Sequence, residues 1–314
     1  MQKSALALSA LFISLTLTGC SSSVTLACDA AGGGAQVDAI EVSSEPLTKP
    51  TVTFASPITA ESIQSRVVIE GDGEVFTGRN LIEFEFAGYN GGTGDLLQET
   101  EFDGKNPAPG FFGPESVPNF CSALVGAKEG SRVVAIFPPK DAHDGRGVES
   151  LGIGPEDSFV FVFDLSRVYL EKAEGSTVAP EAGMPAVVTT PEGIPGITIP
   201  SSEAPDELRI AQLIKGAGET VKTGENVTMH YSGFLWDGGT KFDSSWDKGS
   251  PAQFVVAQGQ LIDGFLSAVI GQTVGSRVVV VIPPALGYGE QASSTIPANS
   301  TLVFVIDILG TSSK

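Results

Sequence analysis

The feature that most constrains this chain is an internal repeat, in which one sequence pattern occurs twice at an offset of 145 residues. The aligned pairs are residues 50–73 with 195–218, 130–134 with 275–279, and 161–164 with 304–307, the last pair at an offset of 143. The proline pair at residues 138–139 likewise falls on the pair at residues 283–284. A pattern that recurs over this length predicts two consecutive domains of the same fold.

The repeat divides the chain into five parts. The first copy is placed at residues 46–172 and the second at residues 195–314. Residues 173–194 between them are rich in Pro, Gly, Ala and Thr, a composition typical of a linker. Residues 1–19 and 20–45, which precede the first copy, have the composition of a signal peptide and of a flexible tether.

The N-terminal residues indicate export. Lys3 is followed by an apolar run of about thirteen residues, 5–17, which is too short to span about 30 Å of hydrocarbon. Residues 17–20, Leu-Thr-Gly-Cys, are similar to the bacterial lipobox, so we expect cleavage before Cys20 and lipidation of its thiol. An ordinary secretory signal with an incidental cysteine is the alternative.

If Cys20 is lipidated, Cys28 and Cys121 are the remaining cysteines. Export would permit a disulfide between them, but no spacing argument brings the two together. A free Cys28 and a buried Cys121 in an apolar helix are the alternative. No pair of cysteines has the spacing of zinc ligands.

Hydrophobic periodicity predicts antiparallel strands in the second copy. Residues 226–231 alternate between apolar and polar, with His230 on the polar side. Residues 276–282 are β-branched and stop at two prolines, which cannot donate hydrogen bonds to a sheet. The residues expected on the core-facing side are Val227, Met229 and Tyr231 in one strand and Leu302, Phe304, Ile306 and Ile308 in another.

One segment of the second copy has helical spacing. Ile262, Phe265, Leu266 and Val269 stand at i, i+3, i+4 and i+7, and Gly271 is placed to end the helix. The chain has 38 Gly and 20 Pro, too many turn-formers for a mostly helical protein. The predicted fold class is therefore α+β, with two tandem domains that each wrap an antiparallel β-sheet around a short α-helix.

The charge balance excludes some classes of partner. The chain has 37 acidic and 18 basic residues, a formal net charge of -19, and a pI near 4.4. Such a surface repels phosphate backbones and anionic membranes, so we expect no nucleic-acid binding. Membrane attachment is therefore expected through the lipid anchor.

Residues suited to covalent or metal chemistry are scarce. His143 and His230 lie in different copies, and neither belongs to a nucleophilic triad. The sequence has no phosphate loop, dinucleotide fingerprint or zinc motif. We therefore expect no metal and no cofactor, and we expect His230 to be a packed strand residue. Any activity would come from a shaped pocket.

Five motifs of the second copy carry a family resemblance. They are residues 230–233 (His-Tyr-Ser-Gly), 241–245 (Lys-Phe-Asp-Ser-Ser), 259–265 (Gly-Gln-Leu-Ile-Asp-Gly-Phe), 283–289 (Pro-Pro-Ala-Leu-Gly-Tyr-Gly) and 296–304 (Ile-Pro-Ala-Asn-Ser-Thr-Leu-Val-Phe). Their order and spacing resemble those of the FKBP-type peptidyl-prolyl cis-trans isomerases, over roughly residues 197–309. The first copy resembles a degenerate form of the same domain.

The resemblance implies an apolar cup with few polar groups. The residues implied as catalytic are Tyr231, Phe242, Asp243, Ile262, Phe265, Tyr288 and Phe304, and those implied as substrate-binding are Gln260, Leu261 and Ile296. Phe265 would form the floor under the prolyl ring, and the Tyr288 hydroxyl and the Ile262 backbone N–H would bind substrate carbonyls. Asp243 would be the pocket carboxylate, and Ile296 would be part of a flap over the mouth.

Four positions depart from the usual family pattern. Phe265 stands where tryptophan is commonest, and Ala252 where the family often has another aromatic residue. Lys248 stands where an arginine often pairs with the aspartate, and Gln260 where glutamate is frequent. Lysine lacks the bidentate geometry of arginine, so these changes bear on substrate preference and macrolide affinity more than on activity.

The first copy departs further from the pattern. The sequence matches Phe86 to Tyr231, His143 to Tyr288, Phe120 to Phe265, and residues 101–103 to residues 241–243. Because both tyrosines are lost, we expect a scaffold or a weak peptide-binding module.

The resemblance implies a peptidyl-prolyl isomerase that assists the folding of exported proteins at the extracytoplasmic face of the cell membrane. The implied partners are proline-containing polypeptides, unfolded exported proteins and macrolide immunosuppressants. A non-catalytic chaperone lipoprotein with two peptide-binding cups is the alternative, although Phe242, Asp243 and Tyr288 favour catalysis. A ligand-binding lipoprotein that feeds a transporter is less favoured, since nothing indicates two doubly wound lobes.

Overall fold

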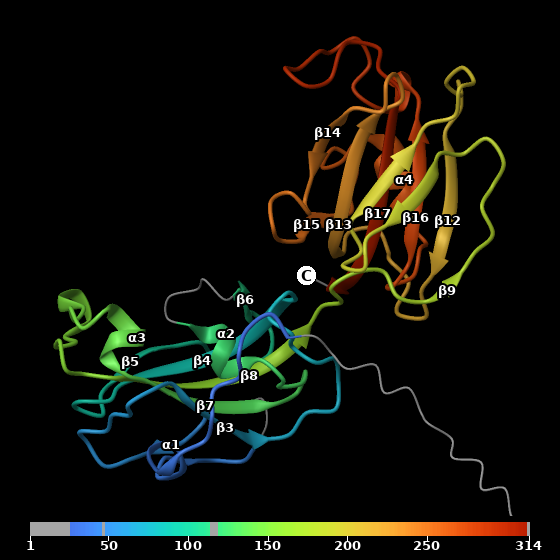
Figure 1. Cartoon of the computed structure of the whole chain (residues 1–314). Helices are drawn as coiled ribbons and strands as arrows, with labels where there is room; N and C mark the ends of the chain where they lie inside the picture. The colour runs from blue at the N-terminus through green and yellow to red at the C-terminus, as the bar shows by residue number, and fades with distance from the viewer. Residues whose placement is uncertain (1–25, 46–47, 114–118, 313–314) are drawn as a thin grey trace, which may run out of the picture.

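A computed structural model describes residues 26–45, 48–113 and 119–312, which form two β-sheet domains in sequence order (Figure 1). The expected signal peptide, residues 1–19, and the lipidation site Cys20 lie outside the described residues, so both stay predictions. Within the described ranges, no helix is long and apolar enough to cross a membrane.

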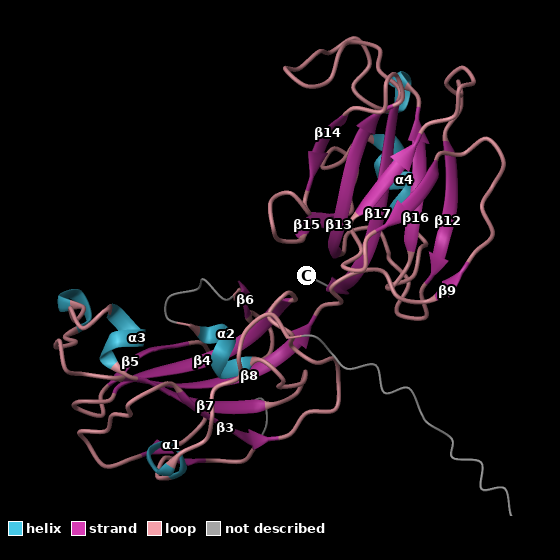
Figure 2. Ribbon diagram, in the orientation of Figure 1, coloured by secondary structure: helices cyan, strands magenta, loops and turns pink. Residues whose placement is uncertain are grey.

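The second domain is an antiparallel sheet with the strand order β14-β13-β17-β16-β12-β9, and β15 also pairs with β13 (Figure 2). Its strands are β9 (Ser176–Thr177), β12 (Arg209–Lys215), β13 (Asn226–Leu235), β14 (Lys241–Ser244), β15 (Ala252–Val255), β16 (Arg277–Ile282) and β17 (Leu302–Ser312). As predicted, β16 stops at Pro283, and a 3₁₀ turn (Pro284–Leu286) follows.

Helix α4 (Asp263–Val269) packs on this sheet and supplies the centre of its core. The predicted faces of β13 and β17 are confirmed, since all seven of their core-facing residues share one cluster with Phe265, Ala268 and Val269. Gly264 lets the helix approach closely, because a Cβ there would lie 2.4 Å from Cγ2 of Ile282. The helix ends as predicted, with Gly271 at φ +81 directly after its C-cap.

The first domain repeats this architecture. Its antiparallel sheet has the order β3-β7-β8-β4-β5, and β6 also pairs with β4. The elements are β3 (Gln64–Ile69), β4 (Leu81–Asn90), β5 (Leu96–Glu99), β6 (Ala108–Phe111), helix α2 (Phe120–Leu124), β7 (Arg132–Phe137), helix α3 (Pro139–His143), a 3₁₀ turn (Glu149–Leu151) and β8 (Phe159–Val168). The register shift between Glu83 and Phe84 matches the one between Thr228 and Met229 at an offset of 145. The α+β class and the tandem repeat are therefore confirmed.

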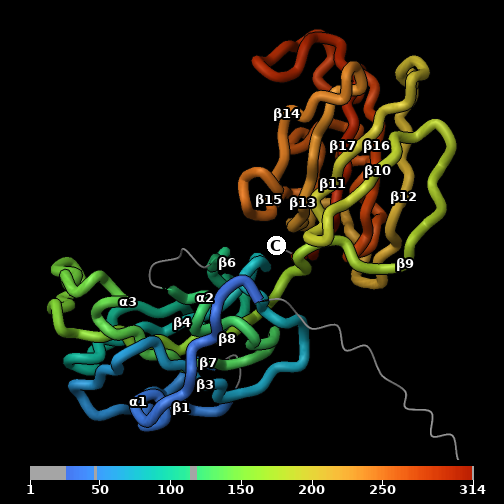
Figure 3. Tube along the Cα trace, in the orientation of Figure 1, coloured from blue at the N-terminus to red at the C-terminus, as the bar shows by residue number. Residues whose placement is uncertain are grey.

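The repeat extends into segments that the sequence assigned to the tether and the linker. Strands β1 (Glu41–Val42) and β2 (Val52–Thr53) form a hairpin, as do β10 (Ala186–Thr189) and β11 (Pro195–Thr198) (Figure 3). The pair Val42 and Val52 corresponds, at an offset of 145, to the pair Val187 and Ile197. Each domain therefore begins with its own hairpin, upstream of the boundary expected from sequence.

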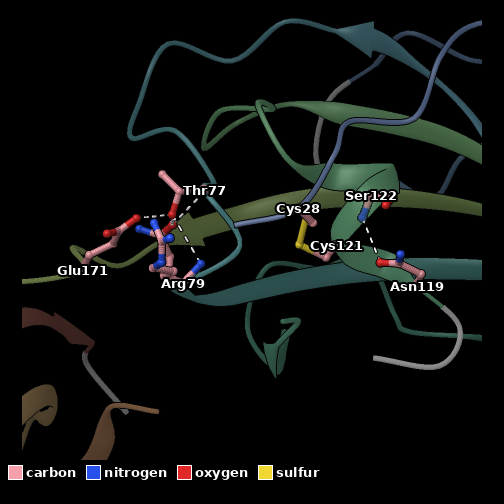
Figure 4. The surroundings of a disulfide bond; sticks show 8 residues. Cys28, Thr77, Arg79, Asn119, Cys121, Ser122 and Glu171 are labelled. Atoms are coloured by element: carbon pink, nitrogen blue, oxygen red, sulfur yellow. Dashed lines mark hydrogen bonds between the residues drawn. A yellow bond between two sulfur atoms is a disulfide. The ribbon is translucent and has the colours of Figure 1, made fainter. Parts of the chain in front are cut away.

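The expectation of a flexible tether over residues 20–45 does not hold from Leu26 onward. Helix α1 (Ala35–Asp38) buries Val37, and Ile40 is buried directly after it. Cys28 forms a disulfide with Cys121 in helix α2 (Figure 4). Of the two alternatives for these cysteines, the structure shows the disulfide.

The expectation of a linker over residues 173–194 is also corrected. Strand β9 adds to the edge of the second sheet beside β12, and Met184 is buried on the outer face of that sheet. The Ala173 N–H donates to Asp307 Oδ2 at 2.9 Å. We call residues 173–194 the second strap, and residues 26–49, as far as they are described, the first strap.

The straps complete a buried ion pair in each domain. Arg132 pairs with Asp164 in the first domain, and Arg277 pairs with Asp307 in the second. Carbonyls of the straps accept further guanidinium N–H groups: the acceptors are Ser43 (2.8 Å) and Thr48 (2.6 Å) for Arg132, and Gly193 (2.7 Å) for Arg277. Because a buried charge is costly unless its hydrogen bonds are satisfied, each strap belongs to its domain's fold.

The connection between the domains is packed as well. Tyr169 is buried, and its hydroxyl donates to Glu83 Oε1 at 2.6 Å. Its ring lies on the end of β17, where a Cβ on Gly310 would be 2.3 Å from Tyr169 Cδ1. Arg167 donates to the Thr311 carbonyl, and the Leu170 N–H donates to the Leu309 carbonyl at 3.2 Å. These contacts hold the last strand of the second domain against the first domain.

Candidate active site

Aromatic side chains from three strands and one helix form an apolar cup in the second domain. Phe265, at the start of α4, lies 5.1 Å from Phe304 of β17 and 6.3 Å from Tyr231 of β13, between ring centroids. Phe242 of β14 lies 5.5 Å from Phe304 at a near-perpendicular angle. The sheet register brings these residues together, because Gly233 is paired with both Asp243 and Phe304.

Gly233 makes room for the cup. A Cβ at this position would lie 2.6 Å from Phe242 Cζ and 2.7 Å from Phe304 Cε1. These distances are shorter than van der Waals contact, so any larger residue would push the two rings apart. The close approach of both rings therefore depends on a glycine here.

The rim of the cup carries a three-residue polar network. The Tyr231 hydroxyl donates to Asp243 Oδ2 at 2.6 Å, and Lys248 Nζ lies 2.6 Å from Asp243 Oδ1. Lys248 Nζ also donates to the Tyr231 hydroxyl oxygen at 3.3 Å. The Nζ atom of Lys248 thus contacts both other members of the network.

The network sets the charge state of its members. Partial burial alone would raise the pKa of Asp243, but the hydrogen bonds from Lys248 and Tyr231 and the ammonium charge hold this pKa below its usual value. Burial, followed by the hydrogen bond to Asp243, raises the pKa of the Tyr231 hydroxyl. At neutral pH the site therefore holds a carboxylate, an ammonium and a protonated phenol.

Other residues implied by the resemblance lie around the cup with different exposure. Ile296 is buried in the same core as Phe265, and Leu261 and Ile262 are half-buried against that core just before α4. Tyr288 is 44% exposed and follows the 3₁₀ turn after β16. Gln260 is exposed, and its backbone N–H donates to the Ala257 carbonyl at 3.1 Å.

One wall residue was missed from sequence. Phe254 of β15 lies 5.9 Å from Tyr231 and 6.4 Å from Phe265, between ring centroids. It is two residues from Ala252, on the same face of the strand, so the period-two pattern of a strand could have identified it. It supplies an aromatic ring to a wall in which Ala252 has none.

Behind Tyr231, a second layer fixes the strand. Ser245 Oγ accepts the Tyr231 backbone N–H at 2.9 Å and lies 2.8 Å from Nδ1 of His230. The imidazole of His230 stacks on Trp246 with ring centroids 3.7 Å apart. The prediction that His230 is a packed strand residue is confirmed, since 6% of it is exposed.

The structure corrects one correspondence between the copies. Tyr89 pairs with Leu96 as Phe234 pairs with Lys241, so Leu97 and Gln98, and not residues 101–103, occupy the positions of Phe242 and Asp243. Thr100 confirms this register, because its Oγ1 accepts the Phe86 N–H at 2.9 Å, as Ser245 does for Tyr231. Asp103 is exposed and accepts the Lys105 N–H at 2.9 Å. The first domain therefore lacks both the tyrosine and the carboxylate.

The sequence matches His143 to Tyr288, but in the structure His143 is a buried residue that connects backbone segments of the first domain. Its Nδ1 accepts the Gly147 N–H at 2.9 Å, so the proton of the neutral ring is on Nε2. That Nε2–H donates to the Asp157 carbonyl at 2.8 Å. Both ring nitrogens are used within the domain, and His143 has no donor left for a substrate.

The first domain nevertheless retains aromatic walls. Phe161, at the position of Phe304, lies 5.3 Å from Phe120 and 6.2 Å from Phe86, between ring centroids. Phe112 packs on Phe120 at 5.1 Å. The arrangement is an apolar cup without a polar rim network of the kind that Tyr231, Asp243 and Lys248 form.

The described residues contain no group of three or more His, Cys, Asp or Glu side chains that could hold a metal ion. The aromatic walls and the polar rim of the second cup are suited to act on a bound chain through shape and hydrogen bonds.

Comparisons with known proteins agree with the geometry. A family model described as FKBP-type peptidyl-prolyl cis-trans isomerase matches residues 217–309, which contain the second cup. The FK506-binding protein of Streptomyces anulatus is 36% identical over 117 residues, which are 37% of this chain and 94% of that protein. A probable FK506-binding protein of Corynebacterium glutamicum is 38% identical over 115 residues, 37% of this chain and 96% of that protein.

A third relative is eukaryotic. FK506-binding protein 2 of Dictyostelium discoideum is 43% identical over 108 residues, which are 33% of this chain and 80% of that protein. About a third of this chain thus covers between 80% and 96% of these three relatives. By fold, by the apolar cup and by these matches, the chain belongs to the FKBP-type peptidyl-prolyl cis-trans isomerases.

Proposed function

We propose that the second domain catalyses the cis–trans isomerisation of prolyl peptide bonds in exported polypeptides, while the first domain binds chains without catalysis. The observation that carries the proposal is the Tyr231–Asp243–Lys248 network at the rim of an aromatic cup. The first domain keeps the aromatic walls Phe120 and Phe161, and it has Phe86, Leu97 and Gln98 where the second has Tyr231, Phe242 and Asp243.

An apolar cup suits this reaction because rotation about the peptide bond requires loss of amide resonance, with a barrier of about 18–20 kcal/mol. In the twisted transition state the amide loses charge separation, so a dry wall of aromatic rings favours it over the planar, more polar ground state. The cup built by Phe242, Phe265 and Phe304 supplies such a surface. It binds the transition state more strongly than the ground state, which is the requirement for catalysis.

Polar groups would hold the chain on either side of the rotating bond. The exposed Tyr288 hydroxyl would donate to one substrate carbonyl, and the Ile262 backbone N–H to another. The carboxylate of Asp243, kept ionised by Lys248, orients the Tyr231 hydroxyl at the rim. Ile296, buried beside the cup, would cover the bound ring.

The assignment of catalysis to one cup is tested with matched variants in a proline tetrapeptide assay. Phe242→Ala should lower kcat/KM by more than about tenfold, because it removes a wall of the second cup. Leu97→Ala, its structural equivalent in the first domain, should leave kcat/KM unchanged. Full activity of a folded Phe242→Ala variant, or loss of activity in Leu97→Ala, would contradict the assignment.

The same cup is proposed to bind macrolides of the FK506 type, since the matched relatives are named for binding FK506. Such a ligand would occupy the space of the prolyl ring between Phe242 and Phe265. Macrolide binding and peptide turnover should therefore compete.

We further propose that the protein is exported and anchored to the cell membrane through a lipid on Cys20. The apolar run before Cys20 and the disulfide between Cys28 and Cys121 support export, because structural disulfides persist in oxidising compartments. The lipid anchor would hold a chain whose net charge of -19 gives it no electrostatic attraction to anionic membranes.

The anchor is tested by Cys20→Ser. This variant should remain unprocessed or be released into the soluble fraction, because the apolar run is too short to span the bilayer. Metabolic labelling with a fatty acid and membrane fractionation measure the two effects. Normal processing of the variant with unchanged detergent dependence would exclude the lipid anchor.

A further inference from the structure

A cavity of about 420 Å³ lies between the two domains, outside both cups. Phe111 of the first domain, Ile194 of the second strap, and His230 and Trp246 of the second domain line it. Phe111 and Ile194 are 36% and 38% exposed, high values for such large apolar side chains. The volume is in the range of about 300–1,000 Å³ that ligand sites occupy, and domain junctions are a common place for such sites.

His230 lines this cavity and has one ring nitrogen without a hydrogen-bond partner among the described residues. The side chain is 6% exposed, and its Nδ1 is bonded to Ser245 Oγ at 2.8 Å. Its Nε2 has no hydrogen-bond partner among the described residues. It is nevertheless not among the fully buried polar atoms of those residues that lack a partner, so it keeps some exposed surface. His230 lines the cavity, so a ligand in the cavity would lie beside its ring.

The protonation of His230 follows from its surroundings. Burial lowers the pKa of His230 to about 4, so the imidazole is neutral at pH 7. The Ser245 hydroxyl donates to the Tyr231 carbonyl at 3.3 Å, so its oxygen accepts the Nδ1–H of His230 at 2.8 Å. The ring proton is then on Nδ1, and Nε2 offers a single hydrogen-bond acceptor to the cavity.

The charged residues of the lining restrict the ligand. Arg79, Glu171 and Glu192 contribute one positive and two negative charges, which disfavours an anion. Arg79 and Glu171 lie beside each other and beside Thr77 (Figure 4). The ligand that fits is not an anion, and it has an apolar ring or branched chain and an N–H group to donate one hydrogen bond.

We propose that this cavity is a third polypeptide-binding site, which takes an aromatic side chain of an extended segment whose backbone N–H donates to His230 Nε2. The inference rests on the proposed function only in that both domains act on polypeptide chains. Peptide is the source that fits the position, because the cavity lies between two domains that each carry an apolar cup. The site needs both domains, since its apolar walls come from each of them.

The chain's histidines provide a direct measurement. His143 and His230 are its two histidines, and the ring of His143 is fully bonded inside the first domain. The full-length protein labelled with ¹⁵N in its imidazole rings would be titrated with the proline-free peptide acetyl-Ala-Phe-Ala-amide. The Nε2 signal of His230 should shift saturably while the signals of His143 stay unchanged. A peptide that shifts neither histidine would overturn the proposal.

Variants of the second strap sharpen the test. Ile194→Asp places a charge in the apolar lining and should weaken peptide binding about tenfold. Val188→Asp is the matched control, because Val188 is 73% exposed in the same strap and does not line the cavity. Both variants should keep the activity on a proline tetrapeptide, which shows that the fold and the second cup are intact. Equal affinity of Ile194→Asp and Val188→Asp would refute the site.

Two further outcomes separate the alternatives. If acetyl-phenylalanine-amide bound as tightly as the longer peptide, the cavity would be a small-molecule site and the polypeptide assignment would be wrong. Loss of isomerase activity from the whole protein would contradict the proposed function, whereas the His230 shift would still report on the cavity. The two proposals therefore fail independently.

Discussion

Lys248 holds the charge of the pocket carboxylate from an exposed position on the rim of the second cup. Its hydrogen bond and charge keep the pKa of Asp243 low, against the effect of partial burial, which raises it. In Lys248→Met the pKa of Asp243 should therefore rise, and the acid limb of the kcat/KM profile should move to higher pH. At pH 7 the loss should stay within about fivefold, because exposed ion pairs contribute about 0.2–1 kcal/mol.

The pH profile is measured by NMR exchange on a proline peptide, which needs no coupling protease. Lys248→Arg is the control, since it keeps the charge and should restore the acid limb of the native enzyme. An unchanged profile in Lys248→Met would mean that Asp243 does not act through its charge, and Asp243→Asn should then be equally silent.

At the scale of the residue, the sequence predicted a set of side chains that lie together in the second cup. In the first cup it assigned the wrong residues to the positions of Phe242 and Asp243. Tyr231, Phe242, Asp243, Phe265 and Phe304 are brought together because each stands in a motif of fixed spacing. In the first copy, the Glu-Phe-Asp of residues 101–103 looks like the motif, but the register of β4 and β5 decides the correspondence. Register depends on strand pairing, which a single motif does not encode.

The straps show a limit of composition at the scale of the element. Pro, Gly, Ala and Thr predict a linker because they offer little apolar surface. The parts of the straps that close the buried ion pairs are backbone carbonyls, those of Ser43, Thr48 and Gly193. Since every residue carries a carbonyl, no side-chain pattern could have revealed this role.

A stability measurement tests the second strap. The fragment of residues 173–314 should be more stable to urea than the fragment of residues 195–314 by about 2–4 kcal/mol. The shorter fragment loses the Gly193 carbonyl that accepts from Arg277 and the Ala173 N–H that donates to Asp307. Hydrogen bonds to charged groups contribute about 1.5–3 kcal/mol each, with partial replacement by water.

The control for this comparison is Val188→Ala in the longer fragment. Val188 is 73% exposed, so its truncation should change the free energy of unfolding by less than about 0.5 kcal/mol. Equal stability of the two fragments would show that residues 173–194 behave as a linker after all, in spite of their hydrogen bonds.

At the scale of the whole molecule, the two domains are held together by buried contacts. Tyr169 follows the last residue of β8. Its ring packs on Gly310 of the second domain, and its hydroxyl donates a hydrogen bond to Glu83 of the first domain. Burial, followed by the bond to Glu83, raises the pKa of Tyr169 to about 12, so the contact persists across the physiological range. The sequence showed two domains but not this joint, because Tyr169 and Gly310 are 141 positions apart and neither belongs to a repeated motif.

The joint predicts a difference between short and long substrates. A chain that rests in the first cup keeps its prolyl bonds near the second cup, at an effective concentration that tethering can raise to about the millimolar range. The full chain should therefore isomerise an unfolded protein whose folding is limited by proline isomerisation faster than the fragment of residues 173–314 does. The two should be equal on a tetrapeptide, which is too short to reach both domains.

Phe161→Ala in the full chain is the matched variant, since Phe161 forms a wall of the first cup as Phe304 forms a wall of the second. It should lose the advantage on the unfolded protein and keep the tetrapeptide rate. Refolding monitored by fluorescence measures the first rate and NMR exchange the second. Equal rates of full chain and fragment on the unfolded protein would remove the holding role of the first domain and leave it a scaffold.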